Sequence, residues 1–107
     1  MILVTGGAYA GKTDFAREHF PGMKLEVRYH ETVRRHLEDG TDPLEAAAAL
    51  AAGKDVVVLL DEVGCGIVPM EASERAYREA VGRTGCFLAG QADEVWRVVL
   101  GIGTRIK

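Results

Sequence analysis

The sequence contains no apolar run long enough to cross a membrane, and it has little cysteine. A membrane-spanning helix needs about 20 consecutive apolar residues, whereas the longest apolar run here covers only 46–52. Cys65 and Cys86 lack a CxxC spacing, which argues against a disulfide framework or a zinc site. Met1 leads directly into an apolar run rather than into a signal peptide. We therefore expect a cytoplasmic protein with two reduced thiols and no membrane span.

An excess of basic residues is also missing. The chain has 13 Lys and Arg against 16 Asp and Glu, with a net charge of −3. Nucleic-acid-binding domains are typically strongly basic, so we expect no nucleic-acid partner. At 107 residues, 48% of them hydrophobic, the chain suffices for one domain, 1–107, with one core. That is small for an enzyme, so either the fold is pared down or neighbouring subunits complete the site.

What the sequence does contain is a complete phosphate-binding loop. Residues 6–13 read Gly-Gly-Ala-Tyr-Ala-Gly-Lys-Thr and follow the apolar run 2–4, which matches the G-x-x-x-x-G-K-[ST] (Walker A) pattern without a mismatch. We expect Lys12 to serve the β- and γ-phosphates and the Thr13 hydroxyl to bind Mg²⁺, with ATP or GTP as the nucleotide. The predicted nucleotide-binding residues are Gly6, Gly7, Ala8, Tyr9, Ala10, Gly11, Lys12 and Thr13.

A second acidic motif follows the apolar strand-like run 55–60. This run ends in Asp61 and Glu62, and ligands of open α/β sheets bind beyond the carboxyl ends of the strands. We therefore predict that Asp61 binds Mg²⁺ together with Thr13, and that Glu62 orients the acceptor as a catalytic residue. The alternative for both residues is an ordinary solvated strand end.

Alternating strand and helix patterns predict an α/β fold with a mostly parallel sheet flanked by helices. Gly85-Cys86 is expected to break the longest helix locally. The predicted strands are 2–4, 24–27, 55–60, 94–100 and 104–106, the predicted helices are 14–20, 29–38, 44–52 and 71–88, and 64–69 is predicted as a loop.

The second half of the sequence resembles a known family. Residues 62–69, Glu-Val-Gly-Cys-Gly-Ile-Val-Pro, are similar to the N-E-V-G-x-G-I-V-P signature of the bifunctional adenosylcobinamide kinase/adenosylcobinamide-phosphate guanylyltransferase family, with Asp61 in place of the Asn. Arg75, Tyr77-Arg78, Gly82-Arg83, Leu88-Ala89, Ala92–Trp96 and Gly101–Gly103 follow at the family spacing. The likeness covers 1–20 and 55–107, and the chain looks like a shortened member that lacks the middle segment.

This resemblance implies a RecA-like P-loop NTPase sheet and a homotrimer with sites at subunit interfaces. It also implies two activities in cobalamin biosynthesis: phosphorylation of the aminopropanol hydroxyl of adenosylcobinamide, a corrinoid, and GMP transfer through a guanylylated histidine. The candidate histidine is His36, which precedes Gly40 and Pro43. Residues 24–54 are too short for the family's middle segment, so guanylyl transfer is in doubt. A surface histidine on a charged helix is the other interpretation of His36.

Three hypotheses remain open at this point. The first is a Mg²⁺-dependent, cobinamide-kinase-like phosphotransferase in which Lys12 and Glu62 are catalytic. The second is a non-catalytic, P-loop nucleotide-binding or regulatory paralogue, because the missing middle segment removes much of the acceptor machinery. The third is a phosphotransferase of the same fold with a different small acceptor.

Overall fold

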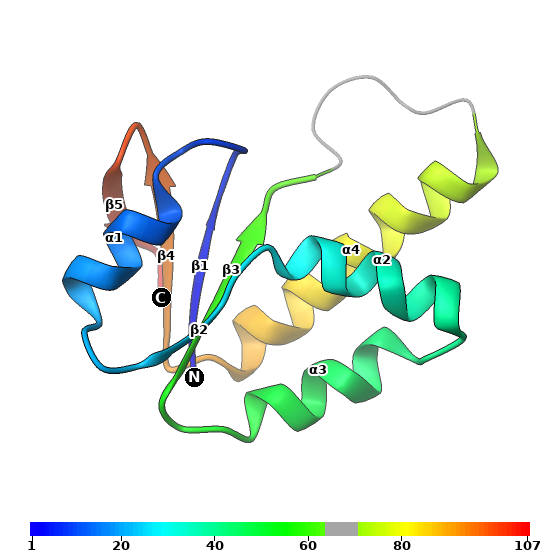
Figure 1. The fold of residues 1–107 in the computed structure, drawn as a ribbon, viewed down its shortest axis with the longest axis horizontal. Helices are drawn as coiled ribbons and strands as arrows, with labels where there is room; N and C mark the ends of the chain where they lie inside the picture. Colours follow the sequence, from blue (N-terminus) through cyan, green and yellow to red (C-terminus); the bar gives the residue numbers. More distant parts are fainter. Residues whose placement is uncertain (64–70) are drawn as a thin grey trace.

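The computed structural model describes residues 1–63 and 71–107. These residues form one five-stranded sheet with helices on both faces (Figure 1). The predicted loop 64–69 lies outside the described residues. In chain order the elements are β1 (Ile2–Gly6), α1 (Lys12–His19), β2 (Lys24–Glu26), α2 (Tyr29–Asp39), α3 (Pro43–Ala51), β3 (Val56–Asp61), α4 (Ala72–Gln91), β4 (Glu94–Val99) and β5 (Ile102–Arg105).

The strands lie in the order β2-β3-β1-β4-β5. The pairs β2–β3, β3–β1 and β1–β4 are parallel, and β5 is antiparallel to β4. The register places Gly6, the last residue of β1, beside Asp61, the last residue of β3. The phosphate loop and the first acidic residue of the second motif therefore leave the sheet side by side.

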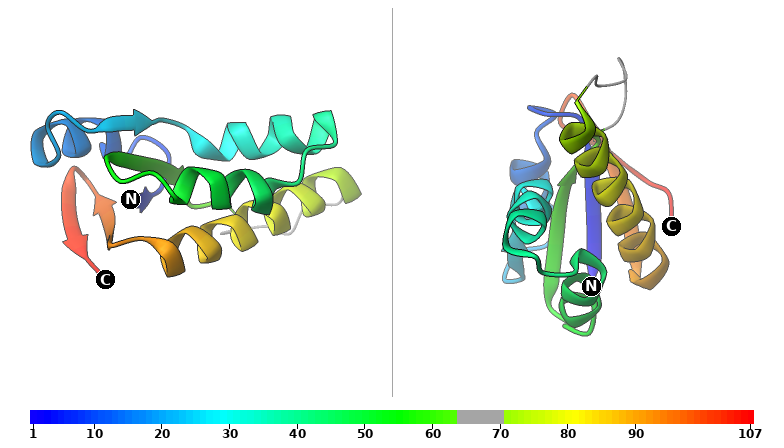
Figure 2. Two further views of the ribbon diagram at one scale, coloured as in Figure 1. Left: turned by 90° about the horizontal axis from the view of Figure 1, so that it is seen from below. Right: turned by 90° about the vertical axis from the view of Figure 1, so that its right-hand side faces the viewer.

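Helix α1 covers one face of the sheet, and α2, α3 and α4 lie side by side on the other (Figures 1 and 2). Strand β3 is buried on both faces because its side chains alternate between two cores. Val56, Val58 and Leu60 pack toward α2–α4, whereas Val57 and Leu59 pack toward α1. This confirms the prediction of a strand covered on both faces.

Local sequence explains where the helices begin. At α3, the Asp42 carboxylate accepts a hydrogen bond from the Leu44 backbone N–H, and Pro43 occupies the first turn, where its missing N–H is not needed. The predicted break in α4 at Gly85-Cys86 is wrong, since the helix continues through both residues. A Cβ atom on Gly85 would lie 3.1 Å from Leu60 Cδ2, so this glycine allows α4 to pack closely on β3.

The predicted fold class, an α/β protein with a mostly parallel sheet flanked by helices, is confirmed. Cys86 is an exposed free thiol, and Cys65 lies outside the described residues. No helix in the described part of the chain is both long and apolar enough to cross a membrane.

Candidate nucleotide-binding site

The phosphate loop rests against the hairpin that joins β4 to β5, and two of its glycines are required by close approach. A Cβ atom on Gly6 would lie 2.5 Å from the Val98 carbonyl oxygen, and one on Gly11 would lie 3.1 Å from Gly101 Cα. Gly11 also has a φ of +89°, which side chains disfavour. The Gly101 N–H donates to the Ala10 carbonyl at 2.8 Å. The loop is therefore held by backbone contacts that leave no room for larger residues.

Helix α1 begins at Lys12, within the last two residues of the loop motif, so its free N-terminal amides are available to an anion. The helix is fixed on the sheet by an aromatic cluster on its buried face. Phe15 stacks on His19 with a centroid separation of 4.0 Å and lies 5.5 Å from the Trp96 ring of β4. This packing aims the positive end of the helix dipole into the cleft.

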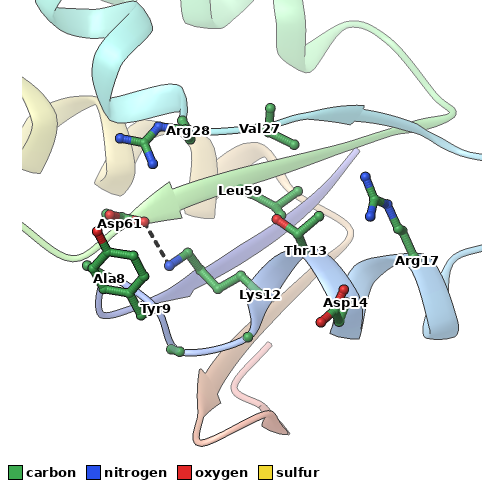
Figure 3. A pocket seen from close by; sticks show the side chains of 12 residues that line it. Ala8, Tyr9, Lys12, Thr13, Asp14, Arg17, Val27, Arg28, Leu59 and Asp61 are labelled. Carbon is green, nitrogen blue, oxygen red and sulfur yellow. Dashed lines mark ion pairs between the residues drawn. The ribbon is translucent and has the colours of Figure 1, made fainter.

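The loop and α1 form one wall of a cleft of about 560 Å³, and the other wall comes from β3 and from the junction between β2 and α2 (Figure 3). The Tyr9 side chain is fully exposed at the rim. The lining residues are Ala8, Tyr9, Ala10, Gly11, Lys12, Thr13, Asp14, Arg17, Val27, Arg28, Leu59 and Asp61. Of the predicted nucleotide-binding residues, those from 8 to 13 line this cleft, whereas Gly6 and Gly7 are not part of its lining.

Lys12 and Asp61, predicted from separate motifs, form an ion pair in the cleft. Lys12 Nζ lies 2.7 Å from Asp61 Oδ1, and it donates to the Gly7 carbonyl at 2.6 Å. Lys12 is only 8% exposed, and a buried ammonium needs such a partner. The pair lies beside the phosphate loop in the lining of the cleft, and the roles of Lys12 toward phosphate and of Asp61 toward Mg²⁺ stay predictions.

His30 is a site residue that the sequence reasoning missed. Its Nε2 lies 3.6 Å from Asp61 Oδ2, on the side of the carboxylate opposite Lys12. The residue is 7% exposed, and its buried Nδ1 has no hydrogen-bond partner among the residues that the structure describes. The available signal was its position in the first turn of the helix after β2, because that turn leaves the sheet at the same edge as the phosphate loop.

Asp61 and Glu62 point to different places, although they are adjacent. Glu62 is paired with the guanidinium of Arg97 on β4 through two hydrogen bonds of 2.8 and 3.1 Å. Its backbone N–H donates to the Gly6 carbonyl at 2.8 Å. Glu62 does not line the cleft, so its role toward the acceptor stays a prediction. The same holds for His36, which lies farther along α2, partly exposed and outside the cleft lining.

The predicted metal ligands, Thr13 and Asp61, both line the cleft. A hydroxyl and a carboxylate suit Mg²⁺, which prefers oxygen ligands and completes its shell with water and substrate phosphates. Within residues 1–63 and 71–107, no group of three or more His, Cys, Asp or Glu side chains is arranged to hold a metal by itself. The donor set therefore fits a metal that arrives with the nucleotide.

This sheet, loop and Lys12–Asp61 pair define a P-loop NTPase of the α/β class. The family is shown by the sequence profile of cobinamide kinase / cobinamide phosphate guanyltransferase, which matches residues 30–106. The chain belongs to this family. The match starts in the first turn of α2, so the interpretation of loop 6–13 depends on its own motif and geometry.

Two curated relatives carry the name bifunctional adenosylcobalamin biosynthesis protein CobU. The protein from Salmonella typhimurium is 42% identical over 78 residues, which cover 73% of this chain and 42% of the relative. The protein from Escherichia coli is 46% identical over 61 residues, which cover 57% of this chain and 34% of the relative. The chain thus spans less than half of the length of either relative.

Proposed function

We propose that this chain binds ATP or GTP with Mg²⁺ and transfers the γ-phosphoryl group to a hydroxyl of a corrinoid, as the kinase half of its family. The observation that carries the proposal is the Lys12–Asp61 ion pair at 2.7 Å, directly beside the phosphate loop. It joins a phosphate-binding cation and a metal-binding anion in one cleft of about 560 Å³, the pair of groups that phosphoryl transfer requires.

In the proposed reaction, the free amides at the start of α1 hold the phosphate chain, and Lys12 moves from Asp61 to the β- and γ-phosphate oxygens. Asp61 and Thr13 would hold the Mg²⁺, and the ion would supply positive charge that stabilises the transferring phosphoryl group. The acceptor hydroxyl oxygen bonds to the γ-phosphorus while the bond to the β-phosphate oxygen breaks. ADP or GDP leaves, and the hydroxyl proton passes to a nearby carboxylate or to water. Glu62 is the carboxylate that we propose to orient the acceptor.

The family's second activity needs a histidine that accepts GMP. His36 is the candidate from the sequence, and His30 is the buried histidine beside Asp61. Incubation with α-labelled GTP, followed by denaturing electrophoresis, tests both residues. Label that is retained by the wild type and lost in only one of His30→Asn and His36→Asn would identify the acceptor, whereas an unlabelled wild type would restrict the function to phosphoryl transfer.

A non-catalytic nucleotide-binding paralogue is the second candidate, and it is favoured by the short span of the chain relative to its relatives. The third candidate, a phosphotransferase with a different small acceptor, is favoured by the same observation.

A homotrimer in which neighbouring subunits complete the site fits the catalytic proposal, because the described residues of one chain leave the cleft open beyond the phosphate loop. Sedimentation equilibrium measures this assembly.

Nucleotide turnover with and without cobinamide separates these candidates. The catalytic proposal expects ATP or GTP turnover that cobinamide stimulates and that Lys12→Ala abolishes, with the exposed Lys54→Ala as the matched control. A folded protein that binds nucleotide but never phosphorylates cobinamide would establish the non-catalytic candidate or a different acceptor.

A further inference from the structure

The cleft has two chemically different ends. Phosphate-loop amides hold the α- and β-phosphates, and the loop lysine reaches the β- and γ-phosphates. The γ-phosphate end is therefore where Lys12 meets Asp61, near Tyr9 and Arg28 (Figure 3). The nucleoside lies toward the opposite end, where α1 carries Arg17. An acceptor that reacts in line with the γ-phosphate must arrive at the Asp61 end.

A second hollow of about 450 Å³ opens at this acceptor end. It shares Val27 and Arg28 with the nucleotide cleft, and the rest of its lining comes from one face of α2. The residues on that face are Glu31, Thr32, Arg34, Arg35 and Glu38. The hollow thus adjoins the nucleotide cleft at Val27 and Arg28, and it is large enough for more than a single hydroxyl group.

The backbone at the junction is in an unusual conformation. Arg28 has a φ of +51° and ends the turn between β2 and α2. A left-handed conformation is costly for a residue with a side chain and tends to persist where function requires it. It turns α2 away from β2 and leaves Val27 at the joint 47% exposed. The joint therefore offers an apolar surface next to a charged one.

Some of the hollow's side chains hold it in place, and others are available to a ligand. Arg34 binds Glu74 at 2.9 Å and lies 3.8 Å above the Tyr77 ring, which anchors α2 on α4. Arg35, in contrast, makes one hydrogen bond, to Thr32 Oγ1 at 3.2 Å, and no ion pair with another described residue. Most of the five N–H donors of its guanidinium are therefore free for a ligand.

The lining combines guanidinium donors with carboxylate acceptors, and this combination selects the ligand. Glu31 is already paired with Arg28, so Glu38, which has no ion pair with a described residue, is the carboxylate that a polyanion would meet unfavourably. A carboxamide, in contrast, both accepts from arginine and donates to carboxylate. We propose that this hollow is the acceptor subsite, and that it binds the carboxamide-bearing edge of the corrinoid while the hydroxyl arm reaches the γ-phosphate. This inference rests on the proposed kinase function.

Two variants test the subsite without touching the nucleotide cleft. Arg35→Gln removes the free donor, and Thr32→Trp fills the hollow. Arg83→Gln on α4 is the control, because it removes the same charge from an exposed arginine whose ion-pair partner is Glu79. The loss of one charge-assisted hydrogen bond should raise the KM for cobinamide about tenfold. The KM for ATP and the turnover without acceptor should stay within about twofold of the wild type.

Equilibrium dialysis of cobinamide with Mg²⁺ and ADP, read from the visible absorbance of the corrin ring, separates this inference from the kinase function. Binding that both variants weaken supports the subsite even where no phosphorylation occurs. Phosphorylation that both variants support as well as Arg83→Gln does would overturn the subsite and leave the kinase function intact. A wild type that neither binds nor phosphorylates cobinamide would overturn both.

Discussion

The two walls of the cleft are held in different ways. The loop wall is fixed by backbone contacts: the Gly101 N–H on the Ala10 carbonyl, the Glu62 N–H on the Gly6 carbonyl, and glycines where a Cβ would collide. The opposite wall includes the β2–α2 junction at Val27 and Arg28, here called the α2 wall. It is held through side chains of α2, namely the Arg34–Glu74 ion pair and the buried Val33. Backbone contacts preserve one geometry across many sequences, whereas side-chain contacts change with the sequence. We infer that the loop wall performs the shared chemistry and that the α2 wall sets the acceptor.

The largest effect on nucleotide turnover is expected from a substitution in the loop wall. Lys12→Ala should lower nucleotide turnover by about 10²–10³-fold, because it removes the charge that stabilises the transferring phosphoryl group. It also leaves Asp61 without its ion-pair partner, so the midpoint of urea unfolding should fall as well. Steady-state kinetics beside Lys54→Ala measures the first effect. Turnover equal to that of Lys54→Ala would refute the assigned role of the loop.

Asp61→Asn removes the carboxylate charge from the Lys12–Asp61 ion pair. Turnover in Mg²⁺ should fall by about 10²-fold because the metal loses a charged ligand. Metal-free nucleotide should instead bind more tightly than to the wild type, because Lys12 no longer has a competing carboxylate. Calorimetric titration of ATP into the protein in the presence of EDTA measures this tighter binding. Weaker binding in both conditions would contradict the proposed exchange of partners.

His30 lies beside Asp61 and should give an intermediate effect. His30→Leu removes the imidazole beside Asp61 and should weaken the activation of turnover by Mg²⁺ about tenfold, as is usual for residues that orient a metal ligand. His30→Gln retains a side-chain N–H donor and should lie closer to the wild type. Turnover measured over a series of Mg²⁺ concentrations distinguishes the two. Equal behaviour of both variants would reduce His30 to a packing residue.

The smallest effect concerns the α2 wall alone. The hydrogen bond from Arg34 lowers the pKa of Glu74 below its ordinary 4.5. A carboxyl group whose pKa is lowered by folding adds stability above its unfolded pKa and loses it as the pH falls. Glu74→Gln should therefore unfold at lower urea than the wild type near about pH 7, and the gap should close toward about pH 3. A gap that is constant with pH would show that the ion pair contributes nothing.

The loop wall could be predicted from the sequence because the residues that form it are contiguous, although the backbone contacts that hold it come from distant Glu62 and Gly101. The pattern of residues 6–13 predicts the geometry of the loop by itself. The position of Asp61 after a buried strand likewise predicts its place at the edge of the sheet. The α2 wall was not predictable in the same way: Arg28 lines the cleft, and His30 lies beside Asp61, only because β2 is parallel to β3. Likewise, Gly85 looked like a helix breaker, but its packing against Leu60 overrides its low helix propensity.

The most direct test of the central claim is calorimetric titration of ATP and of GTP into the purified protein, with Mg²⁺ and with EDTA. The account predicts that at least one nucleotide binds, that Mg²⁺ tightens its binding about tenfold or more, and that Lys12→Ala abolishes the binding while Lys54→Ala does not. Absence of binding of either nucleotide to the folded protein, in both conditions, would contradict it.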